Sequence, residues 1–253
     1  MTNIVLYPRI ASEPISEYAY RVLYENIIRM DLKPGECLST AEVAKLFQTS
    51  RTPIQSAFSR LTAIGLLDVY PQRGTYVSLI DMKRVYQSVY MRNLTDQAII
   101  RILCEKELSE KDLIELEANL SQQEFYYSKD RPEEVFALDL AFHAMLYRLS
   151  NMDYVQQALQ SIVIDQHRMR MLKLRSHIRW QQTSEEHRII LQAIRDKNAE
   201  IGCQQSYQHV SRFGIDIEAT YALYPNYFTN WSTDYLKMFD CEKNPMFFMK
   251  TSI

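Results

Sequence analysis

Residues 34–77 read PGECLSTAEVAKLFQTSRTPIQSAFSRLTAIGLLDVYPQRGTYV, and this stretch decides how the N-terminal third of the chain folds. It follows an amphipathic run over 16–30 and opens with a short helix capped by Ser39 or Thr40. Pro53 suits the first turn of the next helix, and a glycine ends that helix. Two β-like runs, LLDVY and TYVSLI, then flank PQRG, which is typical of a hairpin. This order predicts three helices followed by a two-stranded ribbon.

Three helices and a ribbon in this order form a winged helix-turn-helix. The same residues resemble the DNA-binding domain of the GntR family of bacterial transcription regulators. The resemblance covers roughly residues 16–80 and rests on the PG turn, the SRTP entry to the third helix, the L-x-x-x-G-L-L exit and the R-G-T-Y-V wing. It implies a DNA-binding regulator. One small winged helix covers only a half-site, so we expect a homodimer on a pseudo-palindromic operator.

The candidate DNA contacts lie at the start of the third predicted helix and at the tip of the wing. The first residues of a recognition helix face base edges and phosphates in the major groove. Arg51 can contact guanine in a bidentate manner, while neighbouring hydroxyl and helix N–H groups hold phosphates. Without the surrounding pattern, SRTP would read as a helix cap and Arg73 as a solvated turn. Family members often carry Arg where this chain has Gln55, which reads adenine, so the operator sequence stays open. The predicted contacts are Ser50, Arg51, Thr52, Gln55, Arg73 and Gly74.

From Met82 onward the strand signals disappear, and six segments carry a 3.6-residue periodicity. Six helices with short links predict an antiparallel bundle, so the chain as a whole is mainly α. The six segments are 82–103, 109–128, 132–149, 152–180, 184–197 and 199–223. The predicted divisions are an N-terminal arm (1–15), the winged helix-turn-helix (16–80), a helical effector-binding and dimerisation domain (81–223) and an aromatic C-terminal extension (224–253).

The C-terminal extension carries more large apolar side chains than an exposed tail usually does. We therefore expect it to pack on the bundle or on a partner subunit. The residues concerned are Tyr227, Phe228, Trp231, Tyr235 and Phe239.

The predicted bundle also contains a set of potential metal ligands. Asp139 and His143 are four residues apart, so they project from one face of a single helix. His187 and His209 lie on two further amphipathic helices. Each His alone is more often an ordinary surface or core residue, but one carboxylate and three imidazoles from three helices can converge on a divalent ion.

These four residues are similar to the metal-binding subset of the FCD effector domain, which follows the GntR-type winged helix. Its pattern is D-x-x-x-H, then a His opening the penultimate helix, then a His on the last helix. The resemblance implies a divalent metal, with Zn²⁺ preferred and Ni²⁺ or Mn²⁺ as alternatives, and a small carboxylate or sugar-acid effector in the open coordination positions. Arg92 matches a carboxylate clamp of related proteins, and it fits a salt bridge to Asp96 equally well. His167 and His177 fall outside the pattern and are expected at the surface.

Composition excludes several other classes of protein. The 253 residues are 47% hydrophobic and 24% charged with a net charge of −2, which excludes low-complexity and disordered chains. No apolar run approaches the ~18 residues of a membrane span, and the N-terminus does not read as a signal peptide. The four cysteines are scattered without a CxxC pair, as in a reducing compartment. We therefore expect a cytoplasmic protein without a membrane partner.

Taken together, these features predict a ligand-responsive transcription regulator, with repression as the favoured direction, and not an enzyme. Two alternatives remain at this point. A metal-dependent hydrolase is disfavoured because no Glu stands where an HExxH-type general base would be. A pure metal sensor is not separated from a ligand sensor by any feature of the sequence.

Overall fold

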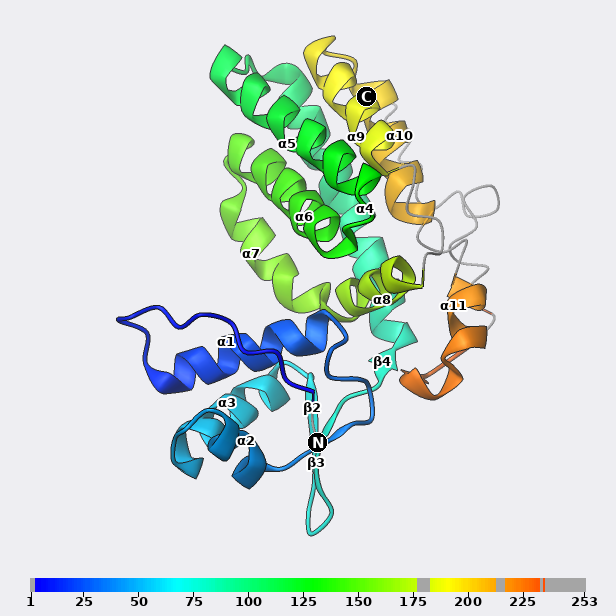
Figure 1. Cartoon of the computed structure of the whole chain (residues 1–253). Coiled ribbons are helices and arrows are strands. Elements are labelled where there is room, and N and C mark those ends of the chain that lie inside the picture. The colour runs from blue at the N-terminus through cyan, green and yellow to red at the C-terminus, as the bar shows by residue number, and fades with distance from the viewer. Residues whose placement is uncertain (1–2, 177–182, 213–216, 233, 235–253) are drawn as a thin grey trace. The chain divides into compact units, whose positions relative to one another are not determined.

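The computed structural model describes residues 3–176, 183–212, 217–232 and 234, and the chain divides into two compact units (Figure 1). The first unit comprises Met1–Asp81 and Leu223–Thr229. The second comprises Met82–Ala222 and Asn230–Ile253. Among the helices of the described ranges, none is both long and apolar enough to span a bilayer.

Three helices form the base of the first unit: α1 (Ile15–Ile28), α2 (Thr40–Leu46) and α3 (Arg51–Ala63). Ser39 caps α2, because its hydroxyl accepts the Glu42 amide at 3.4 Å. Helices α1 and α3 pack on each other through apolar side chains that recur every three to four residues. Those buried on α1 are Ala19, Val22, Leu23 and Ile27, and those on α3 are Ile54, Ala57, Phe58 and Leu61.

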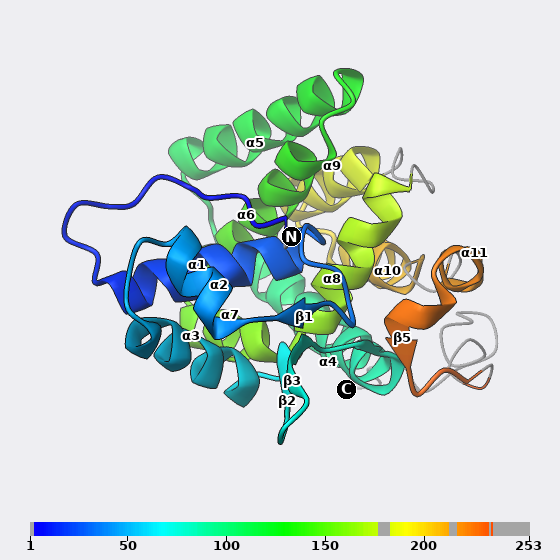
Figure 2. The ribbon, with the colours of Figure 1, turned by 60° about the horizontal axis from the view of Figure 1, so that its bottom comes forward.

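The wing is an antiparallel sheet in the order β1 (Cys37–Leu38), β3 (Gly74–Val77), β2 (Leu67–Tyr70) (Figure 2). Gly74 opens β3 at a φ of 118°, which only glycine adopts readily, so the hairpin reverses there. The predicted ribbon is confirmed. Strand β1 was not predicted, because two residues are too few to show an alternating pattern.

The C-terminal extension contributes a strand to the first unit. β5 (Phe228–Thr229) pairs in parallel with β4 (Ile80–Asp81), and Phe228 is buried. Within the second unit, Trp231 stacks on Tyr221 with ring centroids 3.7 Å apart. Trp231 thus packs within the helical unit as expected, whereas Phe228 is buried within the first unit. Tyr235 and Phe239 lie outside the described residues.

The second unit is a bundle of helices in which α5 lies beside α6 and α9 beside α10 (Figure 1). A capping box of Ser109 and Asp112 starts α5, and Pro132 occupies the first turn of α6. The apolar core includes Ile100, Leu116, and Phe142. The helices are α4 (Met82–Glu105), α5 (Glu110–Ser128), α6 (Pro132–Leu149), α7 (Asp153–Ile162), α8 (Ile164–Arg175), α9 (Thr183–Arg195), α10 (Ala199–Ser211) and α11 (Ile217–Leu223).

The prediction of six helices is wrong, because two of the predicted segments are each divided. The segment 152–180 breaks at Val163, whose ψ of 4° departs from the helical value. Val163 lies in a run of three β-branched residues of low helix propensity, and the apolar periodicity continues across the break and hides it. In the segment 199–223, α10 ends at Ser211 and α11 begins at Ile217, with residues 213–216 outside the described ranges.

Candidate functional site

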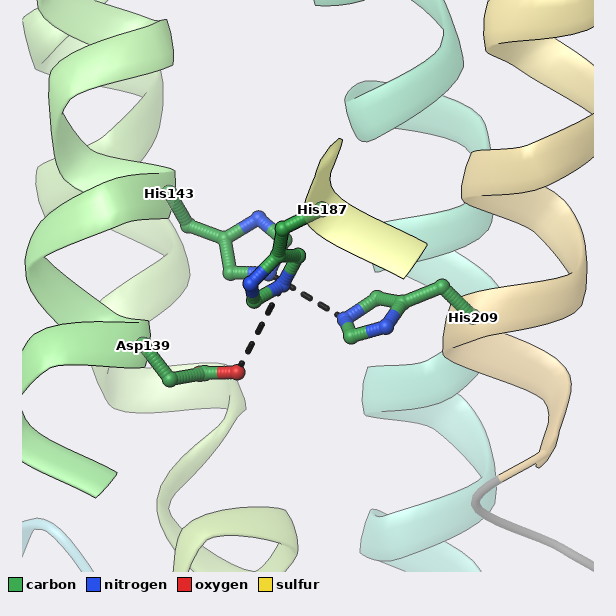
Figure 3. Close-up of side chains that lie close together, drawn as sticks. All are labelled: Asp139, His143, His187 and His209. Atoms are coloured by element: carbon green, nitrogen blue, oxygen red, sulfur yellow. Dashed lines mark hydrogen bonds and ion pairs between the residues drawn. The ribbon is translucent and has the colours of Figure 1, made fainter. Parts of the chain in front are cut away.

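Three helices of the second unit bring the four predicted metal ligands together. Asp139 and His143 come from α6, His187 from α9 and His209 from α10, and one ligand atom of each lies within 4.8 Å of the others (Figure 3). The Nε2 atoms of His143 and His209 are 3.3 Å apart, and His187 Nε2 is 3.7 Å from Asp139 Oδ1. Ligand atoms ~2.1 Å from a shared ion lie roughly 3–4 Å from one another. The cluster therefore has the dimensions of a metal site.

Three atoms of this cluster are buried without a hydrogen-bond partner among the described residues, and one of them, Asp139 Oδ2, forms an ion pair with Arg170. Asp139 is 1% exposed and His187 is 0% exposed. In the part of the chain that the structure describes, Asp139 Oδ1 and His187 Nε2 accept or donate no hydrogen bond. Buried polar atoms are nearly always partnered. A cation between the two atoms would supply the missing partner, so the residues present fit a divalent metal.

Hydrogen bonds from outside the cluster orient two of the imidazoles. Gln123 donates its Nε2 to Asn119, which leaves its Oε1 to accept from His187 Nδ1 at 3.1 Å. His209 Nδ1 donates to Glu186 Oε2 at 2.7 Å. In both rings the proton sits on Nδ1, so the Nε2 lone pair faces the centre of the cluster.

Burial and neighbouring charges set the protonation of the ligands. Burial alone would raise the pKa of Asp139, but the charge of the adjacent Arg170 guanidinium outweighs it and holds that pKa well below its usual value. Burial lowers the pKa of His143, and Arg92 lowers it further. Burial likewise lowers the pKa of His187. A charged carboxylate and neutral imidazoles are the states that bind a metal.

Arg92 lies on α4 at the edge of the cluster and is buried. Its Nη2 is 2.9 Å from Asp96 Oδ2 and 3.1 Å from His143 Nε2. Tyr147 donates its hydroxyl to the other Asp96 oxygen at 2.6 Å. The salt bridge to Asp96 therefore exists, and it holds the Arg92 guanidinium against His143, one of the predicted ligands.

Three residues at the cluster were not predicted: Gln123, Glu186 and Arg170. Glu186 directly precedes His187 in the first turn of α9 and is buried against His209. Arg170 lies on α8, where Asp165 and Arg168 are 1% and 0% exposed. The sequence did offer one signal: charged residues occur on several sides of α8, so some of them had to lie in the interior of the bundle.

The expectation for His167 is wrong. It is half-buried on α8 and contacts the Phe136 ring edge-on at 5.6 Å. Burial and then the charge of Arg170 lower its pKa to about 3. The cause of the error is that α8 is covered on several sides, so its His does not face solvent. His177 lies outside the described residues.

The predicted DNA contacts all lie at the surface of the first unit. Ser50 occupies the N-cap position of α3 but makes no capping hydrogen bond, so its hydroxyl is not engaged by the helix. Arg51 has no ion pair or hydrogen bond within the described ranges. The residues exposed on α3 and at its start are Ser50, Arg51, Thr52 and Gln55, and those exposed at the wing are Arg73 and Gly74.

A winged helix-turn-helix followed by a helical bundle with an Asp/His cluster in its interior is typical of a class of DNA-binding transcription regulators. Comparison with known families agrees with this class. Residues 15–77 match the bacterial regulatory proteins of the gntR family, and residues 89–212 match the FCD domain. The chain belongs to the GntR family and carries its FCD-type helical domain.

Individual relatives support the same assignment. The chain is 30% identical to an HTH-type transcriptional regulator from an unstable DNA locus of Streptomyces ambofaciens, over 83% of this chain and 87% of the relative. It is 29% identical to the HTH-type transcriptional repressor RspR of Escherichia coli K12, over 64% of this chain and 70% of RspR. Among solved structures, E. coli McbR/YncC shares the fold with a TM-score of 0.70 at 19% identity, covering 84% of this chain and 99% of McbR/YncC. The protein is thus a DNA-binding transcriptional regulator.

Proposed function

We propose that this regulator is a homodimeric repressor whose helical unit binds one divalent metal and a small organic-acid effector, and that it is not an enzyme. The observation that carries the proposal is the cluster of Asp139, His143, His187 and His209 with two buried ligand atoms that lack partners. Three imidazoles and one carboxylate suit Zn²⁺, with Ni²⁺ or Mn²⁺ as alternatives. When bound, the ion supplies open coordination positions for a carboxylate oxygen.

The DNA-binding part of the proposal rests on the exposed start of α3. Arg51 is available for a bidentate contact to a guanine, and Ser50 and Thr52 for phosphates. Gln55, Arg73 and Gly74 complete the contacts, and two copies of the chain bind the halves of a pseudo-palindrome in the cytoplasm. Repression is favoured because one relative is named a repressor.

Effector binding changes DNA affinity through α4. This helix begins at Met82, directly after β4, and it carries Arg92 beside the metal ligands. A ligand shifts DNA affinity only if it binds one arrangement of the two winged units better than another. A coupling of ~1–3 kcal/mol corresponds to a roughly 5–150-fold change in operator affinity.

A screen of small carboxylates by thermal shift, with and without Zn²⁺, tests the ligand-binding part, because any ligand selective for the native state raises apparent stability. An acid found in this way should release operator from the wild type. Arg92→Ala should keep metal and DNA binding and lose the response to that acid. An unchanged effector midpoint in Arg92→Ala would show that the clamp lies elsewhere.

The same experiment separates the alternatives. If chelation alone releases operator and no acid has an effect, the protein is a metal sensor. A hydrolase is disfavoured by the contacts of Glu186, whose two carboxylate oxygens already accept from His209 and Arg212 and so are not free to act as a general base.

A further inference from the structure

We propose that the effector is a small dicarboxylate, and that Arg170 on α8 binds its second acidic group while the first occupies the metal. This inference rests on the metal site proposed above. It adds the charge of the ligand and the residue that selects it.

Arg170 is placed to act beside a bound metal without being displaced by it. Its Nη2 lies 2.6 Å from Asp139 Oδ2, whereas Asp139 Oδ1 faces His187 Nε2. The two carboxylate oxygens are thus divided between the arginine and the imidazole cluster. The guanidinium also lies over the Phe136 ring, 5.3 Å from its centroid, which limits its freedom.

One end of the Arg170 guanidinium is not used by the protein. Its Nη1 is buried and has no hydrogen-bond partner in the part of the chain that the structure describes. A buried donor without a partner is unfavourable, and guanidinium groups are well suited to carboxylates. The unpartnered Nη1, a few ångströms from a metal ligand, is therefore a site for an anionic group.

Metal binding would free one N–H donor of a second guanidinium, that of Arg92, which stays paired with Asp96. Arg92 Nη2 now donates to the Nε2 lone pair of His143. A neutral imidazole has one acceptor nitrogen, so a metal on Nε2 ends this hydrogen bond. Arg92 and Arg170 contact ligands that are four residues apart on α6, about one helical turn or ~6 Å. Both arginines therefore contact the cluster, which suits a ligand with two separate acidic groups.

The balance of buried charges points to the same ligand. Arg92 is paired with Asp96, Arg170 with Asp139, and Arg212 with Glu186, so each pair is neutral. Arg212 is the most exposed of these groups, at 44%. A divalent ion bound at the cluster would add two positive charges to these three neutral pairs. A dicarboxylate cancels both charges, whereas a monoacid leaves one buried charge and an uncharged sugar leaves two.

The test compares ligands of equal shape and different charge on the full-length, Zn²⁺-loaded protein. Succinate and glutarate are titrated by calorimetry beside succinamate and glutaramate, in which an amide replaces one carboxylate. Inorganic phosphate serves as a dianion with a single centre. We expect at least one dicarboxylate to bind at least ~10-fold more tightly than its monoamide.

Variants of Arg170 then identify the residue responsible. Arg170→Gln should weaken dicarboxylate binding on the order of 10–100-fold and change monoamide binding by less than ~3-fold. Arg170→Lys keeps the charge and should retain part of the preference. Arg148→Gln is the matched control, because Arg148 lies on α6 in the same unit but is exposed and paired with Glu115. It should change neither affinity.

Equal binding of dicarboxylates and monoamides, a preference for phosphate, or an equal loss of both ligands in Arg170→Gln would overturn the proposal. Zinc is measured in every sample. A wild type that binds no zinc refutes the metal site itself, whereas a zinc-loaded wild type without charge preference refutes only the dicarboxylate. If Arg170→Gln loses zinc, the zinc-loaded Arg170→Lys variant decides. A reduced preference for the dicarboxylate over its monoamide supports the role of Arg170, and an unchanged preference counts against it.

Discussion

Arg51→Ala should weaken operator binding and relax its specificity without affecting the fold. Arg51 is the first residue of α3, is exposed, and makes no ion pair or hydrogen bond among the described residues. Alanine is also the best helix former. We therefore expect the free energy of unfolding to change by less than ~0.5 kcal/mol. A lost bidentate base contact should cost ~1–3 kcal/mol of binding, or roughly 5–150-fold in operator affinity.

Arg60→Ala is the matched control on the same helix. Arg60 lies in the last turn of α3, 2.6 Å from Glu17, with its guanidinium 3.9 Å from the centroid of the Tyr20 ring. Its loss should lower stability by about 1 kcal/mol and leave operator specificity unchanged.

Fluorescence anisotropy measures both variants on an operator selected from random DNA and on a scrambled duplex, at one fixed salt concentration because phosphate contacts depend on salt. Arg51→Ala should narrow the difference in affinity between the operator and the scrambled duplex. If Arg51→Ala binds the operator like the wild type, or if Arg60→Ala loses specificity in its place, the recognition surface has been assigned wrongly.

Three further substitutions test the packing. Gly202→Ala should destabilise the bundle by ~1–3 kcal/mol in thermal unfolding, since an added Cβ would lie 2.7 Å from Ile100 Cγ2, and the helix-propensity gain of about 1 kcal/mol does not offset this. A His167→Gln variant should lose less stability in acid. The folded-state pKa of His167, about 3, lies below the unfolded value of ~6.5. As the pH is lowered through that window, the free energy of unfolding therefore decreases by up to roughly 1.4 kcal/mol per pH unit from this group. Urea unfolding at several pH values measures this slope, and an unchanged slope would contradict the burial of His167. Phe228→Ala should release β5, seen as faster chymotrypsin cleavage and a change in Trp231 emission at constant helical content; unchanged cleavage would mean that Phe228 does not hold the strand.

The fold could be predicted where local signals are strong. Helices α1, α3 and α4 to α6 have long apolar periodicity and clear end signals, and their existence is confirmed. The missed features lack such signals. Strand β1 has two residues, and the break at Val163 interrupts neither the periodicity nor the composition around it.

The candidate site divides in a similar way. Asp139 and His143 could be placed on one face from their spacing, and the family resemblance added His187 and His209. The residues that orient these ligands could not be found, because their contacts depend on packing between helices. Gln123 meets His187 across 64 positions of sequence. Arg170 reaches Asp139 from α8, a helix whose polar interior has no periodic pattern.

Metal content is the most direct test of the role assigned to the helical unit. Elemental analysis of the purified full-length chain should find one divalent ion per chain in the wild type. The double variant His143→Ala/His187→Ala should hold none, with its helical circular dichroism and its operator binding retained. A wild type without bound metal after incubation with Zn²⁺, or a double variant with unchanged occupancy, would contradict the assignment of the Asp139, His143, His187 and His209 cluster as a metal centre.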